Sequence, residues 1–163
     1  MTLGDRFRFA LVTGFGTGLA PFAPGTFGTI PGVAIGVGIE IVCGPSSIAW
    51  VTAAVAAVLL AVGCAQTEFT RRAFGSKDPG AFVLDEIVGV LVAAAIGQAF
   101  AGPLGVVGWS FCFALFRVFD ITKVWPARSL EAIPGAPGIM LDDVAAGVWS
   151  GALLIVAAAL GWF

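Results

Sequence analysis

The sequence predicts an all-α, polytopic membrane protein with about five spanning helices. Of its 163 residues, 59% are hydrophobic and only 11% are charged, whereas soluble domains carry roughly 25% charged residues. A helix that crosses a hydrocarbon core of about 30 Å needs roughly 20 mostly apolar residues. Several stretches of the chain reach or approach that length, so we expect residues 1–163 to form a single membrane-embedded domain.

The first apolar stretch, residues 9–26, differs from an ordinary spanning segment. It contains four glycines and two prolines, which interrupt helices and favour turns. We therefore expect a short helix followed by a Gly/Pro-rich segment that is either re-entrant or interfacial.

The rest of the chain alternates apolar stretches with turn signals. Gly44-Pro45 and Gly102-Pro103 predict tight turns, and the polar stretches 71–81 and 123–141 predict longer loops. The predicted spanning helices cover residues 27–43, 48–70, 82–101 and 104–122, and a last helix starts near Asp142 and runs to the C-terminus.

The charged residues gather on one side of this arrangement. When the five helices alternate across a bilayer, all eight Lys and Arg residues fall on one side, which the positive-inside rule makes cytoplasmic. Nine of the ten acidic residues fall there too, and only Glu40 lies near the opposite face. Avoidance of lipid explains why acids lie at helix ends, but not why nine share one side. The cytoplasmic side is therefore the expected functional side.

Composition excludes several kinds of partner and site. No basic run or tail is present, so nothing points to a nucleic acid. The three cysteines are dispersed in apolar segments, which argues against a disulfide framework or a zinc site. Histidine is absent, and with it the commonest transition-metal ligand and the usual base at neutral pH. Any bound metal should therefore be a hard cation with oxygen ligands.

Two pairs of adjacent acids, Asp85-Glu86 and Asp142-Asp143, each open a predicted helix. One acid at a helix N-terminus is an ordinary cap, but two adjacent acids, twice, exceed what capping needs. Carboxylates held close together repel one another unless some are protonated or a cation lies between them, and oxygen ligands favour Mg²⁺. Gly89 and Gly147 follow the two pairs one turn later, which hints at similar packing of the two helices.

Other charged residues accompany these pairs. Arg117, Asp120 and Lys123 are spaced by three, so they share one face of a helix. Asp120 can join the acids while the two cations flank them; the alternative is a local ion-pair ladder at a helix end. Asp78, in Asp78-Pro79-Gly80, indicates first a turn and second a further metal ligand.

A glycine-rich segment precedes these charges, from Gly14-Phe15-Gly16-Thr17-Gly18 to Pro24-Gly25-Thr26. Glycines permit positive φ and close backbone approach, so successive amides and threonine hydroxyls could form an anion-binding concavity. The alternative is a flexible or tightly packed membrane segment. Together with the cations and a metal, such a concavity suits the phosphate of a lipid head group.

Three blocks of the sequence resemble the phosphatidylglycerophosphatase A family. They are GFGTGLAPFAPGTFGT (14–29), DPGAFVLDEIVGV (78–90), and FRVFDITK followed by GIMLDDVAAGV (116–123 and 138–148). The resemblance implies an Mg²⁺-dependent phosphatase of the bacterial inner membrane. Such an enzyme removes the terminal phosphate of phosphatidylglycerophosphate and leaves phosphatidylglycerol.

The resemblance also implies roles for individual residues. The acidic, metal-binding centre would comprise Asp85, Glu86, Asp120, Asp142 and Asp143. The phosphate-binding groups would be Arg117 and Lys123 beside it, with Gly16, Thr17, Gly18, Pro24, Gly25 and Thr26 in the loop. The chain departs from the family pattern after Lys123, where Val124 stands in place of a common proline.

The hypothesis for mechanism is that the carboxylates bind one or two Mg²⁺ ions, which hold the phosphate and activate water. Direct attack by water and an aspartyl-phosphate intermediate both stay open. Two other classes of function are open as well. One is an ion or proton transporter with carboxylates along its pathway, for which Glu40 is the candidate in the far half. The other is a non-catalytic membrane subunit whose acids only form ion pairs.

Overall fold

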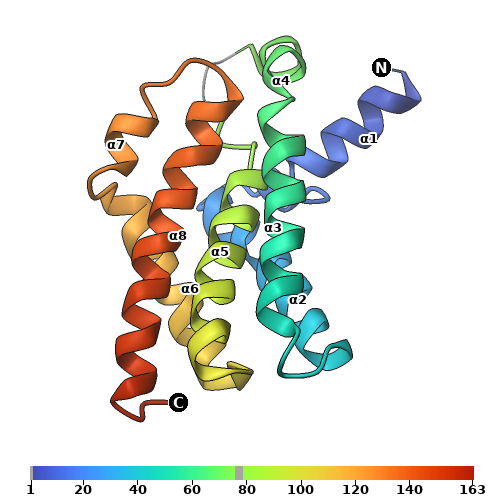
Figure 1. The fold of residues 1–163 in the computed structure, drawn as a ribbon. Helices are drawn as coiled ribbons and strands as arrows, with labels where there is room; N and C mark the ends of the chain where they lie inside the picture. The colour runs from blue at the N-terminus through green and yellow to red at the C-terminus, as the bar shows by residue number, and fades with distance from the viewer. Residues whose placement is uncertain (1, 76–78) are drawn as a thin grey trace.

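The computed structural model describes residues 2–75 and 79–163, and within these ranges every regular element is helical (Figure 1). The elements in chain order are α1 (Leu3–Val12), the 3₁₀ turn η1 (Thr17–Leu19), α2 (Pro24–Val42), α3 (Ile48–Cys64), α4 (Thr67–Phe74), α5 (Leu84–Ala101), α6 (Gly105–Thr122), α7 (Ala127–Leu130) and α8 (Ala136–Ala159).

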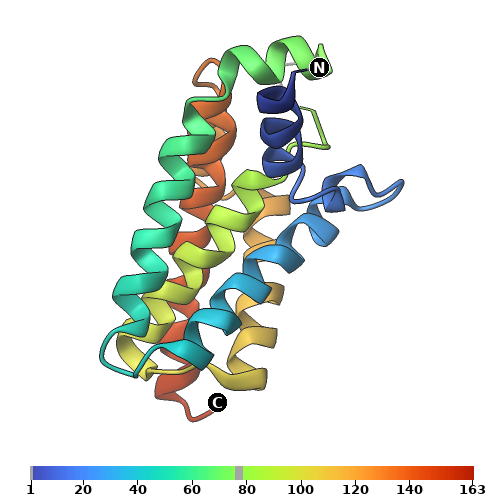
Figure 2. The ribbon, with the colours of Figure 1, turned by 90° about the vertical axis from the view of Figure 1, so that its right-hand side faces the viewer.

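The long helices form a membrane-spanning bundle. Over the described residues, α2, α5, α6 and α8 are each long and apolar enough to cross a bilayer, and α3 with α4 makes a fifth candidate if the bent pair counts as one span. The prediction of a polytopic helical membrane protein is confirmed. α5 lies at the centre, packed on α8, α3 and α2 (Figures 1 and 2). Groups at the N-terminal end of α5 are therefore shielded from lipid, whereas Phe100 near its C-terminal end is exposed.

The predicted span 48–70 is wrong at its C-terminal end. α3 stops at Cys64, and after a bend of 60° the chain continues as α4, which reaches into the predicted loop 71–81. α4 carries Glu68, Arg71 and Arg72, and charged residues at the centre of a span cost about 2.5–3.5 kcal/mol each. The chain therefore turns, and α4 lies across the end of the bundle (Figure 2).

The predicted starts of two other helices are also wrong. α8 begins at Ala136, not near Asp142, so Asp142 and Asp143 lie in its second turn. α2 begins at Pro24, so Gly25 and Thr26 are helical instead of belonging to a loop. In both helices a proline occupies one of the first two positions, where its missing N–H costs nothing and its fixed φ suits a helix. These prolines act as helix starts and not as turn signals.

α5 and α8 approach one another closely where two glycines meet. A Cβ atom at Gly89 would lie 2.7 Å from the carbonyl oxygen of Asp143, and one at Gly147 would overlap the carbonyl oxygen of Gly89. The hint of similar packing after the two acidic pairs is thus confirmed. Because Asp85 and Asp143 each lie one turn before their glycine, the same close crossing brings the acids of the two helices together.

We expect Gly147→Ala to lower the free energy of unfolding by about 2 kcal/mol, since a methyl group forced into a packed contact costs about 1–3 kcal/mol. Reversible unfolding in mixed detergent micelles measures the change. Gly38→Ala in α2 is the matched control, because a Cβ there meets nothing within 4 Å. Equal stability of the two variants would show that the crossing is loose.

Candidate metal and phosphate site

A cavity of about 360 Å³ lies where the N-terminal parts of α2, α5 and α8 meet the C-terminal end of α6. Acids and cations from distant parts of the sequence face it. Its charged lining residues are Asp85, Glu86, Arg117, Asp120, Lys123, Glu131, Asp142 and Asp143. All five predicted acids and both predicted cations therefore border one cavity.

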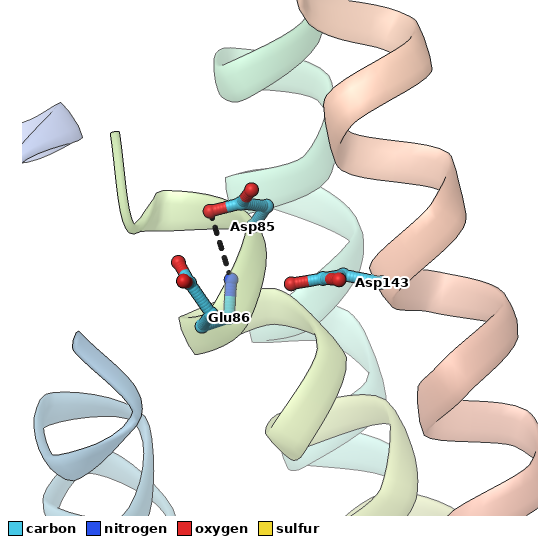
Figure 3. Close-up of side chains that lie close together, drawn as sticks. All are labelled: Asp85, Glu86 and Asp143. Carbon is cyan, nitrogen blue, oxygen red and sulfur yellow. Dashed lines mark hydrogen bonds between the residues drawn. The ribbon is translucent and has the colours of Figure 1, made fainter. Parts of the chain in front are cut away.

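Three of the acids form a compact cluster, shown in Figure 3. Asp85 and Glu86 come from the first turn of α5 and Asp143 comes from α8, and each offers one oxygen within 4.8 Å of the others. Only 7% of Asp85 and 3% of Asp143 is exposed. Glu86 Oε2 and Asp143 Oδ2 are buried without a hydrogen-bond partner among the described residues. Buried, unpaired carboxylate oxygens at this separation fit the ligand set of a hard cation.

The other two acids are paired with cations. Arg117 Nη1 forms an ion pair with Asp120 Oδ2 and lies 3.9 Å from Glu86 Oε1. Lys123 Nζ donates a hydrogen bond to Asp142 Oδ2 and lies 3.4 Å from Glu131 Oε1. The five predicted acids thus divide into three that converge on one point and two that hold the cations in place.

The ammonium of Lys123 stays charged in this setting. Burial by itself lowers its pKa, but the hydrogen bond to Asp142 and the charges of Asp142 and Glu131 outweigh burial and raise the pKa above its usual range. Lys123 therefore offers a permanent positive charge at the edge of the cavity.

The formal charge of the cavity is strongly negative. Among the described residues, six carboxyl groups and two cations line it, so its charge would be −4 with every group ionised. A phosphate monoester is itself an anion, and like charges held close in a poorly solvated site repel strongly. Either protonation of some of the carboxyl groups or a bound divalent cation would reduce this repulsion, so the charge of the cavity is compatible with a metal in the cluster.

Comparisons with known proteins give the chain its family. The family model described as phosphatidylglycerophosphatase A matches residues 10–158. The chain belongs to this family. It is 36% identical to phosphatidylglycerophosphatase A of Haemophilus influenzae (93% of this chain, 88% of the relative) and 30% identical to that of Escherichia coli (88% and 79%). No solved structure matches.

A further relative carries a different name. A protein of Bacteroides thetaiotaomicron, 36% identical over 89% of each chain, is named provisionally as a phosphatidylinositol-3-phosphatase. All three relatives are named as phosphatases, and membership of the family makes the present chain a phosphatase as well. The names differ in the lipid that carries the phosphate.

The glycine-rich segment is divided in the structure. Gly25 borders the cavity, whereas Gly16, Thr17, Gly18 and Thr26 do not border the part of it that the described residues form. The Thr17 hydroxyl donates to the carbonyl of Gly14 at 2.9 Å, and a Cβ atom at Gly18 would lie 2.5 Å from the carbonyl oxygen of Ala81. The segment packs against the chain that leads into α5, and its binding of phosphate stays a prediction.

Of two further acidic residues, Asp78 and Glu131, the structure describes one. Asp78, the further ligand expected from the sequence, lies outside the described residues. Glu131 was not predicted, although it borders the cavity and pairs with Lys123. No motif or helical spacing connects Glu131 with the other acids, because it follows α7 in an irregular segment.

Proposed function

We propose that this phosphatase hydrolyses the terminal phosphate of phosphatidylglycerophosphate, giving phosphatidylglycerol and inorganic phosphate, and that it requires Mg²⁺. The observation that carries the proposal is the buried cluster of Asp85, Glu86 and Asp143, which shares a cavity with two cations. The relatives from H. influenzae and E. coli, named for this activity, support the choice of substrate.

Asp85, Glu86 and Asp143 would hold the metal. The bound Mg²⁺ would neutralise charge on the phosphate and would lower the pKa of a water molecule. The backbone N–H of Glu86 donates to Asp85 Oδ1, and that of Asp143 donates to Asp142 Oδ1, both at 3.0 Å. These bonds fix the orientation of one carboxylate in each pair before substrate arrives, so little ordering remains to be done on binding.

Arg117 is the group best suited to bind the phosphate oxygens. Its side chain is largely buried, Nη1 faces Asp120 in the ion pair, and Nε has no hydrogen-bond partner within the described part of the chain. A guanidinium held at one edge by a carboxylate keeps its remaining donors directed, and its planar shape matches two phosphate oxygens. Lys123, fixed by Asp142, would add a point charge from the other side of the cavity.

We propose that the cavity faces the cytoplasm in the bacterial inner membrane. α1, α4 and α7 carry exposed basic residues and lie at the same end of the bundle as the cavity (Figure 1). The positive-inside rule makes that end cytoplasmic. The phosphate would then be removed at head-group depth while the diglyceride stays in the lipid.

Glu40, the candidate pathway residue of a transporter, has a structural role. Its Oε1 atom accepts hydrogen bonds from Gln98 Nε2 at 2.9 Å and from the backbone N–H of Leu104 at 2.8 Å. The carboxylate thereby links the end of α2 to the turn between α5 and α6 at the far end of the bundle. This role favours the phosphatase over a pathway for ions.

Phosphate release from purified protein in lipid vesicles tests the proposal. With Mg²⁺ we expect release from phosphatidylglycerophosphate at a higher kcat/KM than from phosphatidylinositol 3-phosphate, and no release in EDTA until Mg²⁺ is restored. No release from phosphatidylglycerophosphate would refute the assigned substrate, and full activity in EDTA would refute the metal. Hydroxylamine-sensitive phosphate on quenched protein would indicate an aspartyl-phosphate, and its absence direct attack by water.

A further inference from the structure

A second cavity, of about 550 Å³, lies as a groove between α2 and α6 in the membrane-spanning part of the bundle. Its walls are mainly apolar, formed by Ile30, Val33 and Val37 of α2 and by Val106, Trp109 and Phe113 of α6. Gly36 makes the groove possible, because a Cβ atom there would overlap the Trp109 ring. The ring can therefore lie against the backbone of α2.

Ser110 and Glu40 in the groove are hydrogen-bonded within the protein, whereas the buried indole N–H of Trp109 has no hydrogen-bond partner among the described residues. The Ser110 hydroxyl donates to the carbonyl of Val106 at 2.8 Å, and Glu40, at the far end, accepts from Gln98 and from the Leu104 amide. Polar groups satisfied in this way place no demand on an occupant. The lining thus suits a hydrocarbon chain.

The groove and the acidic cavity lie in line along one face of α6. Ile121 and Arg117 border the cavity, and Phe113, Ser110 and Val106 border the groove. Successive members of this series are three or four residues apart, so they form a single stripe on the helix. α2 is shared in the same way, with Pro24 and Gly25 in the cavity and Ile30 to Glu40 along the groove.

The length of the stripe matches the length of one acyl chain. Arg117 and Val106 are 11 residues apart in α6, which at 1.5 Å per residue is about 16 Å. An acyl chain extends over half of a hydrocarbon core about 30 Å thick, which is about 15 Å. A lipid with its phosphate beside Arg117 would therefore have its chain alongside the groove.

We infer that the groove binds one acyl chain of the lipid whose phosphate occupies the acidic cavity, an inference that rests on the proposed function. Any membrane lipid can cover an apolar surface. Only a lipid with its head group in the acidic cavity, however, has a chain that enters this groove from the end nearest that cavity. Moving a chain from lipid into the groove gains no hydrophobic free energy. The groove acts by orientation: a held chain restricts how the phosphate meets Arg117 and the acidic cluster.

Blocking the groove tests this role. We expect Val37→Trp to lower the ratio of kcat/KM for dioleoyl over dihexanoyl phosphatidylglycerophosphate about tenfold, because a displaced long chain misplaces the reacting phosphate. The short chains do not reach Val37, which is 12 residues or about 18 Å from Gly25 along α2. Val58→Trp, on the 62%-exposed Val58 of α3, is the matched control and should keep the wild-type ratio.

The outcomes separate this inference from the proposed function. Failure of the wild type to release phosphate from either lipid would refute the proposed function itself. An active wild type with equal ratios in Val37→Trp and Val58→Trp would overturn the groove alone. Should Val37→Trp not fold, phosphatidylglycerophosphate with a diazirine at the end of one acyl chain gives a second measurement. Labelling of α2 and α6 that persists in excess phosphatidylcholine supports the groove, and labelling spread evenly over α3 and α8 contradicts it.

Discussion

Asp143→Asn is expected to reduce phosphate release on the order of 10³-fold, which corresponds to about 4 kcal/mol of transition-state stabilisation. Asp143 is the one member of the three-acid cluster that comes from α8, so its loss leaves the metal with ligands from α5 alone. In the absence of Mg²⁺ the same variant should be at least as stable as the wild type. The reason is that the substitution removes a buried charge that repels Asp85 and Glu86.

Thermal unfolding with and without Mg²⁺ checks both halves of this prediction. The wild-type Tm should rise with added Mg²⁺, because a ligand that binds only the folded state stabilises it, and the Asp143→Asn Tm should not respond. Asp5→Asn is a matched control, since Asp5 caps α1 outside the cavity, and its Mg²⁺ response should equal that of the wild type. An inactive Asp143→Asn protein with an unchanged Mg²⁺ response would show that Asp143 does not contribute to metal binding.

The sequence predicted the bundle well because the length of an apolar stretch can be read from the sequence without knowing how the helices pack. It failed where the decision depended on packing. Residues 48–70 are apolar for most of their length, and only the position of α4 across the bundle end shows that the helix stops at Cys64. The sequence places Pro137 in the predicted loop 123–141, whereas in the structure it lies in the first turn of α8, where proline is favourable.

For the site, the sequence predicted which residues take part, but not which acids pair with a cation and which join the acidic cluster. Asp142 and Asp143 are adjacent, and neighbouring residues on a helix point about 100° apart. One therefore meets Lys123 and the other meets the acids of α5. Nothing in the sequence distinguishes the two, because the direction of each depends on where α5 and α6 lie. The apolar groove could not be predicted from the sequence either, because its lining residues resemble any lipid-facing surface until α2 and α6 are placed side by side.

Gly25 borders the site as the sequence predicts, but its role in the structure differs from the predicted one. The sequence suggested a backbone cradle for phosphate, but Gly25 lies in the first turn of α2 and its φ is not positive. A Cβ atom there would overlap Glu86 Oε1 and lie 2.9 Å from a guanidinium nitrogen of Arg117. Glycine at this position lets α2 approach the ion pair at the centre of the site.

Gly25→Ala is therefore expected to lower kcat/KM about 100-fold, since displacing a catalytic group by about 1 Å can cost that much. The alanine keeps the backbone N–H and imposes no strain on a helical φ, so a loss of activity has to come from the displaced Glu86 and Arg117. The Mg²⁺ response of the Tm should weaken in parallel. Gly38→Ala in the same helix, where a Cβ meets nothing within 4 Å, should keep activity and stabilise the helix by up to about 1 kcal/mol. Full activity of Gly25→Ala would mean that Glu86 and Arg117 can move aside without cost, and that the close approach of α2 serves packing alone.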